Sequence, residues 1–188
     1  MIGAGWGATA EEQRISLGCD EVLPAASLRL HRAISIEVPP RLVFRWLCQL
    51  RVAPYSYDLL DNFPRRSPRE LRPGTEELEQ GQRFMSIFRL VSFEEGRQIT
   101  LRARRTAVSY AALPKRSPTT GMGTPTAVTP TDSTATRLLA RVLFDPPGGP
   151  IAGPLLAQGL ALGDLVMMRK QLMTLRELAE RDARRETA

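Results

Sequence analysis

The chain has 188 residues, of which 43% are hydrophobic and 24% charged, and it carries a net charge of +6. This length and composition fit one globular domain and exclude a disordered or fibrous chain. No apolar run approaches the ~20 residues of a membrane helix. Residues 1–14 lack the basic start and apolar run of a secretion signal, so we expect a cytoplasmic protein.

The positive charge suggests nucleic acid or an anionic membrane surface as partners. Lys115 and Lys170 are the only lysines among the 26 basic residues. The arginines are scattered along the whole chain, which argues against a nucleic-acid-binding tract. Cys19 and Cys48 match neither a disulfide framework nor a metal motif, and we expect both to be reduced. With His31 as the only histidine, we expect no metal site, and no cofactor motif is present.

The first regular element is expected after a flank. Residues 1–27 show no clear period and are interpreted as a flexible N-terminal flank. From Leu28 to Val38 apolar and polar residues alternate as in a half-buried strand, with Arg32 as the one misfit on the apolar face. Pro39 and Pro40 end this strand, and helical spacing of apolar residues predicts a short amphipathic helix over residues 40–50.

The middle of the chain predicts an irregular stretch followed by antiparallel strands. Residues 52–73 are rich in turn formers, with one helical turn expected at 57–62. One strand is predicted over residues 83–93. Three more are predicted over residues 98–104, 107–113 and 136–144. Residues 114–133 are rich in Pro, Thr and Gly and predict a long, mobile loop.

The last predicted element is a long amphipathic helix. Asp164 follows Gly163 and has the features of a helix N-cap. Apolar residues then recur every three or four positions, and Gly and Pro are absent to about Arg184. This helix needs the sheet face as its partner. We therefore expect residues 28–184 to form a single α+β domain, with a curved antiparallel sheet that carries helices on one side only.

Four segments carry a family resemblance: FRWLCQLRVAPYSYDLLDN at 44–62, RRSPRELRPG at 65–74, GQRFMSIFRL at 81–90 and GDLVMMRKQL at 163–172. Together with the element order, they resemble a group of uncharacterised bacterial proteins of the SRPBCC superfamily. That superfamily also includes birch-pollen-allergen-like proteins, StAR-related lipid-transfer domains and polyketide cyclases. The resemblance covers residues 28–181. It implies the helix-grip fold and a cavity between the sheet and the C-terminal helix, without assigning catalytic residues.

Twelve residues are candidates for lining that cavity. They are Trp46, Tyr55, Tyr57, Asp58, Asn62, Phe84, Phe88, Leu101, Asp164, Met168, Gln171 and Leu172. The cluster at 55–62 can orient a polar ligand or act in acid–base chemistry, or it can simply pack and cap a turn. A further hypothesis pairs Arg169 or Gln171 with Asp58 or Asp61.

Three functions remain open at this stage. The leading one is binding or carriage of a hydrophobic or amphipathic small molecule, which requires a mostly apolar cavity. The second is a cyclase- or aromatase-like enzyme acting on a polyketide-type or polycyclic substrate, which requires converging polar groups with a perturbed pKa. The third is an interaction module, which requires the arginines to gather on one face.

Overall fold

In the computed structural model, residues 4–56, 67–115, 134–145 and 149–186 are described, with side chains in the last range described from residue 157. Seven strands form one sheet in the order β1-β2-β7-β6-β5-β4-β3. The strands are β1 (Gly5–Trp6), β2 (Leu28–Ile36), β3 (Arg83–Phe84), β4 (Phe88–Glu94), β5 (Gln98–Ala103), β6 (Thr106–Pro114) and β7 (Thr136–Phe144). The pair β1–β2 is parallel and the remaining neighbours are antiparallel, so the sheet is mixed; it is also unclosed. The predicted α+β class is confirmed.

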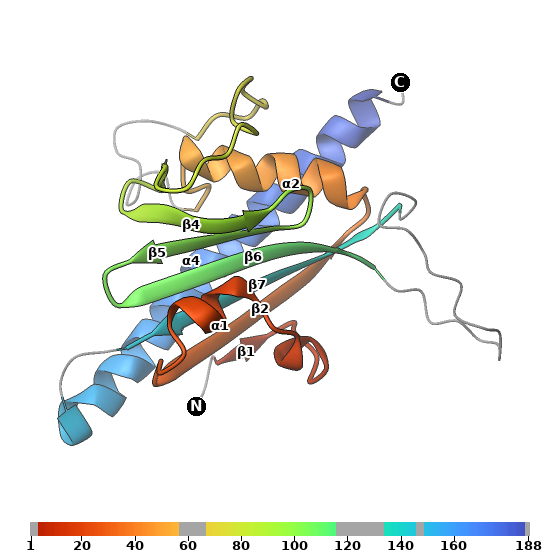
Figure 1. Cartoon of the computed structure of the whole chain (residues 1–188). Helices are drawn as coiled ribbons and strands as arrows, with labels where there is room; N and C mark the ends of the chain where they lie inside the picture. Colours follow the sequence, from red (N-terminus) through yellow and green to blue (C-terminus); the bar gives the residue numbers. More distant parts are fainter. Residues whose placement is uncertain (1–3, 57–66, 116–133, 146–148, 187–188) are drawn as a thin grey trace, which may run out of the picture.

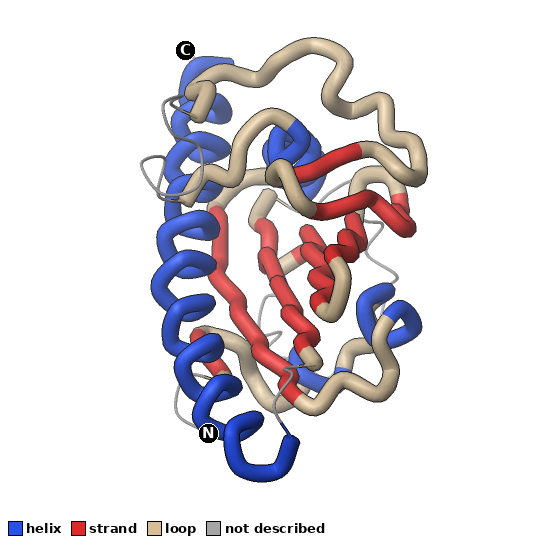
Figure 2. Tube along the Cα trace, turned by 90° about the vertical axis from the view of Figure 1, so that its left-hand side faces the viewer, coloured by secondary structure: helices blue, strands red, loops and turns tan. Residues whose placement is uncertain are grey.

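Helix α4 (Gly149–Glu186) runs along one face of the sheet (Figures 1 and 2). Its 38 residues give a length of roughly 57 Å at 1.5 Å per residue. The prediction that this helix begins near Asp164 is wrong, since Asp164 lies inside it. Gly159 and Gly163 lower helix propensity, but the packing of Ala157 and Ala161 in the core outweighs that cost.

Helix α2 (Pro40–Cys48) confirms the predicted amphipathic helix and continues into a 3-10 turn, η2 (Gln49–Arg51). Pro40 occupies its first turn, where the missing N–H has no intrahelical partner to lose. The helix packs against α4 and against β6, on the same face of the sheet. Its apolar side is fully buried and brings Trp46 into the interior.

The N-terminal segment covers the opposite face of the sheet. Residues 4–27, expected as a flexible flank, carry β1, a 3-10 turn η1 (Glu12–Arg14) and helix α1 (Gly18–Val22). Helix α1 packs on β5, β6 and β7, so the expectation of helices on one side only is wrong (Figure 2). The sequence shows no period here because η1 and α1 are only three and five residues long, and the segment is held by apolar contacts, ion pairs and single close approaches.

Gly7 makes one such close approach. It has φ 73°, and a Cβ at this position would lie 2.1 Å from the carbonyl oxygen of Ala33. Only glycine therefore allows the chain to pass so close to β2.

The predicted strand 83–93 is a hairpin of β3 and β4. Met85 and Ser86 have φ of 43° and 64°, and the N–H of Ile87 donates to the carbonyl of Met85 at 2.8 Å. The alternation of apolar residues continues through the turn, so the sequence pattern gives no sign of the reversal. The other predicted strands correspond to β2, β5, β6 and β7, whereas the predicted loop tip at 116–133 and the helical turn at 57–62 fall outside the described residues.

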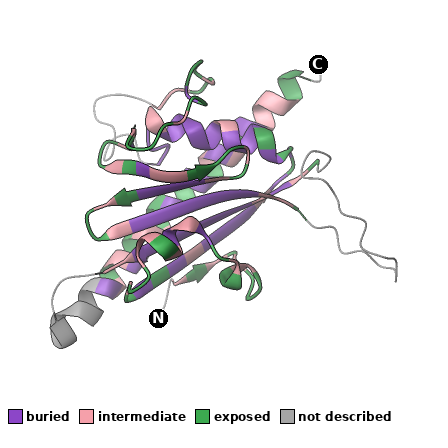
Figure 3. Ribbon diagram, viewed as in Figure 1, coloured by how far each residue is buried: buried purple, intermediate pink, exposed green. Residues whose placement is uncertain are grey.

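The main core lies between the sheet and the two helices α2 and α4, and burial is deepest over the central strands (Figure 3). A second, smaller apolar cluster lies beneath α1 on the other face; it contains Leu17, Cys19, Ala33, Ala107, Ala111, Leu139 and Leu143. The sheet thus buries apolar residues on both faces. Within the described part of the chain, none of the helices combines the length and apolar character needed to cross a bilayer.

Candidate functional site

A buried polar group lies in the interior, where β6 faces α4. The hydroxyl of Tyr110 donates to Oε1 of Gln171 at 2.7 Å and lies 3.6 Å from Sδ of Met168. The amide of Gln171 donates to the carbonyl of Pro54 at 2.5 Å. All three side chains are buried. This bridge ties the sheet, the long helix and the segment after α2 together at one point.

The positions of these residues follow from the two structural periods. Tyr110 shares the inner face of β6 with Val108 and Ala112, because side chains two apart in a strand point the same way. Met168 and Gln171 are three apart in α4 and therefore lie on the same side of the helix. The interior therefore brings together one phenol, one amide and the thioethers of Met168 and Met85 at this point.

Trp46 and Tyr55 form the aromatic part of the site. Their rings meet edge to face, with centroids 5.8 Å apart and planes at 89°. Both side chains are fully buried. The indole Nε1 of Trp46 has no hydrogen-bond acceptor among the described residues. A buried donor without an acceptor costs about 1–3 kcal/mol. The N–H of Trp46 therefore destabilises the core unless it finds an acceptor.

Tyr55 also carries an unusual backbone. Its φ is 56°, in the left-handed region that residues with a Cβ seldom adopt. Such a conformation costs on the order of 1–3 kcal/mol and tends to occur at ligand clamps and active sites. The strained residue stands directly after Pro54, whose carbonyl accepts from Gln171.

A buried ion pair joins β2 to α4. The guanidinium of Arg32 donates to Oδ2 of Asp164 at 2.7 Å, and its side chain is fully buried while that of Asp164 is 18% exposed. Arg32 also donates to the carbonyls of Ala4 and His31. Asp164 is therefore not the predicted N-cap: inside the helix no backbone N–H is left to cap, and its carboxylate serves as the counter-charge of Arg32.

Burial governs the titration of these groups. Desolvation raises the pKa of Asp164 from 3.8 to about 6, although the charge and hydrogen bond of Arg32 act in the opposite direction. Burial, with the nearby negative charge of Asp164 as a smaller cause, raises the pKa of the Tyr110 phenol far above its usual range. Tyr110 is thus a neutral hydrogen-bond donor at physiological pH, whereas Asp164 can exchange a proton near neutrality.

Most of the predicted lining residues reach the interior. Phe84, Leu101, Leu172 and Met168 are buried in the main core, and Phe88 packs against it partly buried. Tyr57, Asp58 and Asn62 lie outside the described residues. Two residues of the interior site, Tyr110 and Arg32, were not among the predicted lining residues. The alternation of β6 and the misfit of Arg32 on an apolar strand face are the signals that could have found them.

The hypothesis that Arg169 or Gln171 pairs with Asp58 or Asp61 involves carboxylates outside the described residues. Gln171 is committed to Tyr110 and Pro54 instead. The guanidinium carbon of Arg169 lies 5.6 Å from the ring centroid of Trp6, a cation–π contact between α4 and the edge strand β1.

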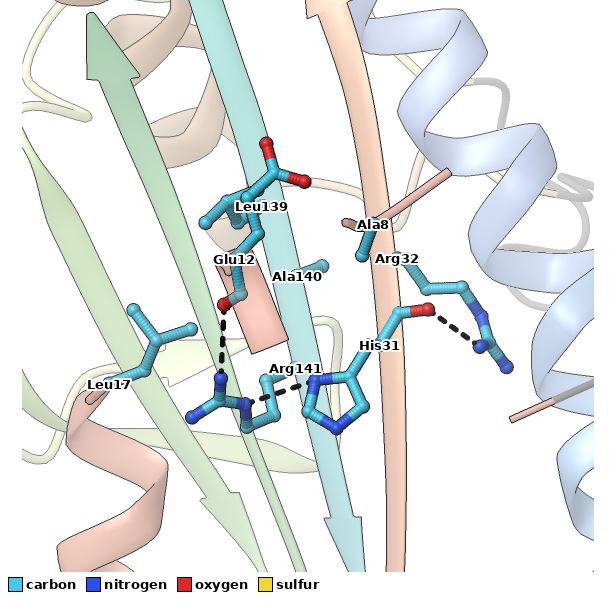
Figure 4. Close-up of a pocket in the computed structure, with 8 residues that line it drawn as sticks. All are labelled: Ala8, Glu12, Leu17, His31, Arg32, Leu139, Ala140 and Arg141. Atoms are coloured by element: carbon cyan, nitrogen blue, oxygen red, sulfur yellow. Dashed lines mark hydrogen bonds between the residues drawn. The ribbon is translucent and has the colours of Figure 1, made fainter. Parts of the chain in front are cut away.

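A small hollow lies on the opposite face of the sheet, between the N-terminal segment and β2 and β7 (Figure 4). Its volume of about 10 Å³ corresponds to roughly one water molecule. His31 and Arg141 line it, with Nε of Arg141 3.4 Å from Nδ1 of His31. Burial, followed by the charge of Arg141, lowers the pKa of His31. This hollow has no room for an organic ligand.

Charged contacts close this face. Arg137 pairs with Glu12 at 2.5 Å, and Arg141 pairs with Asp20. These pairs hold the N-terminal segment on two arginines of β7 that point away from the main core. The sequence gives no sign of these pairs, because residues far apart in the chain share no common period. Among the described residues, no three His, Cys, Asp or Glu side chains gather as a metal site would require.

Comparison with known proteins gives limited similarity. No family model matches the chain, and no curated protein matches it. A solved structure of the protein TTHA0849 from Thermus thermophilus is 15% identical, with a TM-score of 0.44, covering 80% of this chain and 96% of that one. A conserved protein of unknown function, EF2215 from Enterococcus faecalis, is 10% identical, with a TM-score of 0.33, covering 80% and 84% of the two chains.

Proposed function

We propose that the protein binds an apolar or amphipathic small molecule between the sheet and α4, with an acceptor group of the ligand on the indole N–H of Trp46. The observation that carries this proposal is the fully buried Nε1 without an acceptor among the described residues. Natural cores seldom leave a donor in this state, because its desolvation is not compensated. A carbonyl or ether oxygen of a bound molecule would satisfy it.

The surroundings of Trp46 support an adaptable site. Tyr55 contacts its ring from a strained backbone conformation. The thioethers of Met85 and Met168 both contact the Tyr110–Gln171 bridge. Methionine side chains are flexible and polarisable, so they repack around ligands of different shapes at low cost. The proposed ligand is therefore mostly apolar, with one acceptor.

The first experiment is native mass spectrometry of the freshly purified protein, followed by solvent extraction of any bound molecule. The second uses prodan, an uncharged naphthalene with one ketone oxygen, as a fluorescent probe. Trp46→Phe keeps an aromatic ring but removes the donor. We expect prodan binding to weaken by about 2- to 10-fold, as one net hydrogen bond implies. The emission of prodan bound to Trp46→Phe should also be shifted to the blue relative to prodan bound to the wild type.

Trp6→Phe is the matched control, because Trp6 lies at the partly buried edge strand β1. We expect it to leave prodan binding unchanged. No co-purified molecule together with no saturable prodan binding would refute the proposal. Equal binding by the wild type and Trp46→Phe would refute the role of the indole.

A second candidate, a cyclase- or aromatase-like enzyme acting on a polycyclic or polyketide-type substrate, draws support from Asp164. Its pKa of about 6 suits proton transfer near neutral pH. Incubating the extracted molecule with wild-type protein and with Asp164→Asn distinguishes the two functions. An enzyme converts the molecule, for instance with loss of water, and Asp164→Asn does not; a carrier returns it unchanged in both cases.

A further inference from the structure

One edge of the sheet carries a row of arginines. The strand register pairs Arg83 of β3 with Arg89 of β4, and Arg89 with Arg102 of β5. Residues paired directly across adjacent strands point to the same face, and neighbouring strands lie ~4.8 Å apart. All three side chains are exposed. Arg104 follows in the turn after β5 and is also exposed. We call these four residues the arginine edge; it lies where β4 begins and β5 ends.

The arginine edge has no counter-charge within the described part of the chain. Other exposed arginines form ion pairs, such as Arg97 with Glu94 and Arg105 with Asp145. In the arginine edge, Arg89 donates to the carbonyl of Gly81, and none of the four is within ion-pair distance of a described carboxylate. Like charges directly opposite each other in a sheet repel and destabilise it. The fold gains nothing from this row, which instead suits an anionic partner outside the chain.

An exposed apolar side chain lies beside these cations. Ile87 forms the tip of the β3–β4 hairpin and is 71% exposed, the highest value among the exposed large apolar residues described. It lies two residues from Arg89, or roughly 7 Å along an extended chain. An apolar side chain flanked by arginines fits the boundary between lipid headgroups and acyl chains.

The composition of this face favours a membrane over a nucleic acid. Binding to single-stranded nucleic acid uses aromatic rings on which the bases stack. On β6 and β7 the arginine row continues as Ala107 and Leu143, which are fully buried beneath α1 and present no binding surface. The next paired row on β4 and β5 contains Ser92 and Thr100. Thr100 is also fully buried, so the accessible surface here is that of the exposed arginines and Ile87, which contains no aromatic ring.

We propose that the arginine edge docks the protein on an anionic lipid surface, with the guanidinium groups on lipid phosphates and Ile87 inserted among the headgroups. The proposal is independent of ligand binding in the interior, since it rests on different residues. Each basic residue near an anionic bilayer strengthens binding by about fivefold, so three arginines together contribute on the order of 100-fold.

The test is co-sedimentation with vesicles of phosphatidylcholine alone and of phosphatidylcholine with one-third phosphatidylglycerol. We expect the wild type to sediment with the anionic vesicles only, and less so as salt is raised, because salt screens exposed charges. Arg83→Gln/Arg89→Gln/Arg102→Gln should lose on the order of 100-fold in affinity. Ile87→Ser should weaken binding at both low and high salt.

A matched control removes the same charge elsewhere. Arg41→Gln/Lys170→Gln/Arg185→Gln changes three exposed cations away from this edge, and we expect only a minor loss. Circular dichroism checks the fold of every variant, and Arg83→Gln/Arg102→Gln replaces the triple variant if that one misfolds. Equal losses in the control and edge variants would overturn the proposal, since net charge alone would then explain binding. Binding to a random-sequence oligonucleotide without binding to anionic vesicles would overturn it as well.

Discussion

The buried ion pair between Arg32 and Asp164 makes a pH-dependent contribution to stability that can be isolated by one substitution. Asp164→Asn replaces the carboxylate with a neutral amide of nearly the same shape, inside α4 and 2.7 Å from the guanidinium of Arg32. The amide does not titrate, so the variant retains every other titrating group of the wild type. The difference in unfolding free energy between the two proteins therefore reports the titration of Asp164.

The sign of the pH dependence follows from the pKa of Asp164, which rises from 3.8 to about 6 on folding because of burial. An acid whose pKa is raised in the folded state favours folding while it is protonated. That contribution is fully present below about pH 4 and is lost as the pH rises through about 6. At about 1.4 kcal/mol per pKa unit, the wild type should lose about 3 kcal/mol relative to Asp164→Asn between about pH 4 and about pH 7.5.

Urea unfolding followed by circular dichroism at both pH values measures this difference. Asp145→Asn is the control, since it removes a partly exposed carboxylate paired with Arg105, an interaction of a kind worth at most about 1 kcal/mol. A wild type that gains stability relative to Asp164→Asn as the pH rises would refute the reasoning. It would mean that the attraction of Arg32 outweighs the desolvation of Asp164.

Three further predictions concern single contacts. Tyr110→Phe leaves Oε1 of Gln171 buried without its donor at 2.7 Å, so the free energy of unfolding should fall by about 1–3 kcal/mol in urea titrations; no change would exclude this bond as a stabilising one. Burial raises the pKa of the Cys48 thiol to about 12, so at about pH 8 both buried cysteines should react with Ellman's reagent only in denaturant, and rapid reaction of the native protein would contradict this. Gly7→Ala should lower the melting temperature more than Gly74→Ala, since both have positive φ but only at Gly7 does a Cβ meet backbone; equal losses would show that φ alone matters.

The sequence predicted those strands and helices in which the spacing of apolar residues matches the residues that the fold buries. The strands β2, β5, β6 and β7 and helix α2 lie close to the predicted ranges. The sequence-based prediction failed where the spacing of apolar residues does not change at the end of a strand or helix. The β3–β4 reversal at Met85–Ile87 keeps the same alternation, and α4 extends past Gly159 and Gly163 because small residues there still pack in the core.

The candidate site was predicted in its apolar part and in one side of each polar contact: Gln171 and Asp164 were predicted, whereas their partners Tyr110 and Arg32 were not. Trp46, Phe84 and Leu172 were expected in the interior because their spacing placed them on apolar faces, and the structure buries them. The partner of Tyr110 is a residue of α4 some sixty positions away. No local pattern specifies such a pairing, since it depends on how the helix is placed across the sheet.

The local periods of the sequence by themselves determined the α+β class, the amphipathic elements and the anomaly of Arg32 on an apolar strand face. Only the tertiary structure shows that Asp164 forms an ion pair with Arg32 and that the N-terminal segment covers the second face of the sheet. The same holds for the row formed by Arg83, Arg89 and Arg102. The physical reason is that hydrophobic periodicity records which face of an element is buried. Ion pairs, strand register and close backbone approach depend on which distant element arrives at that face.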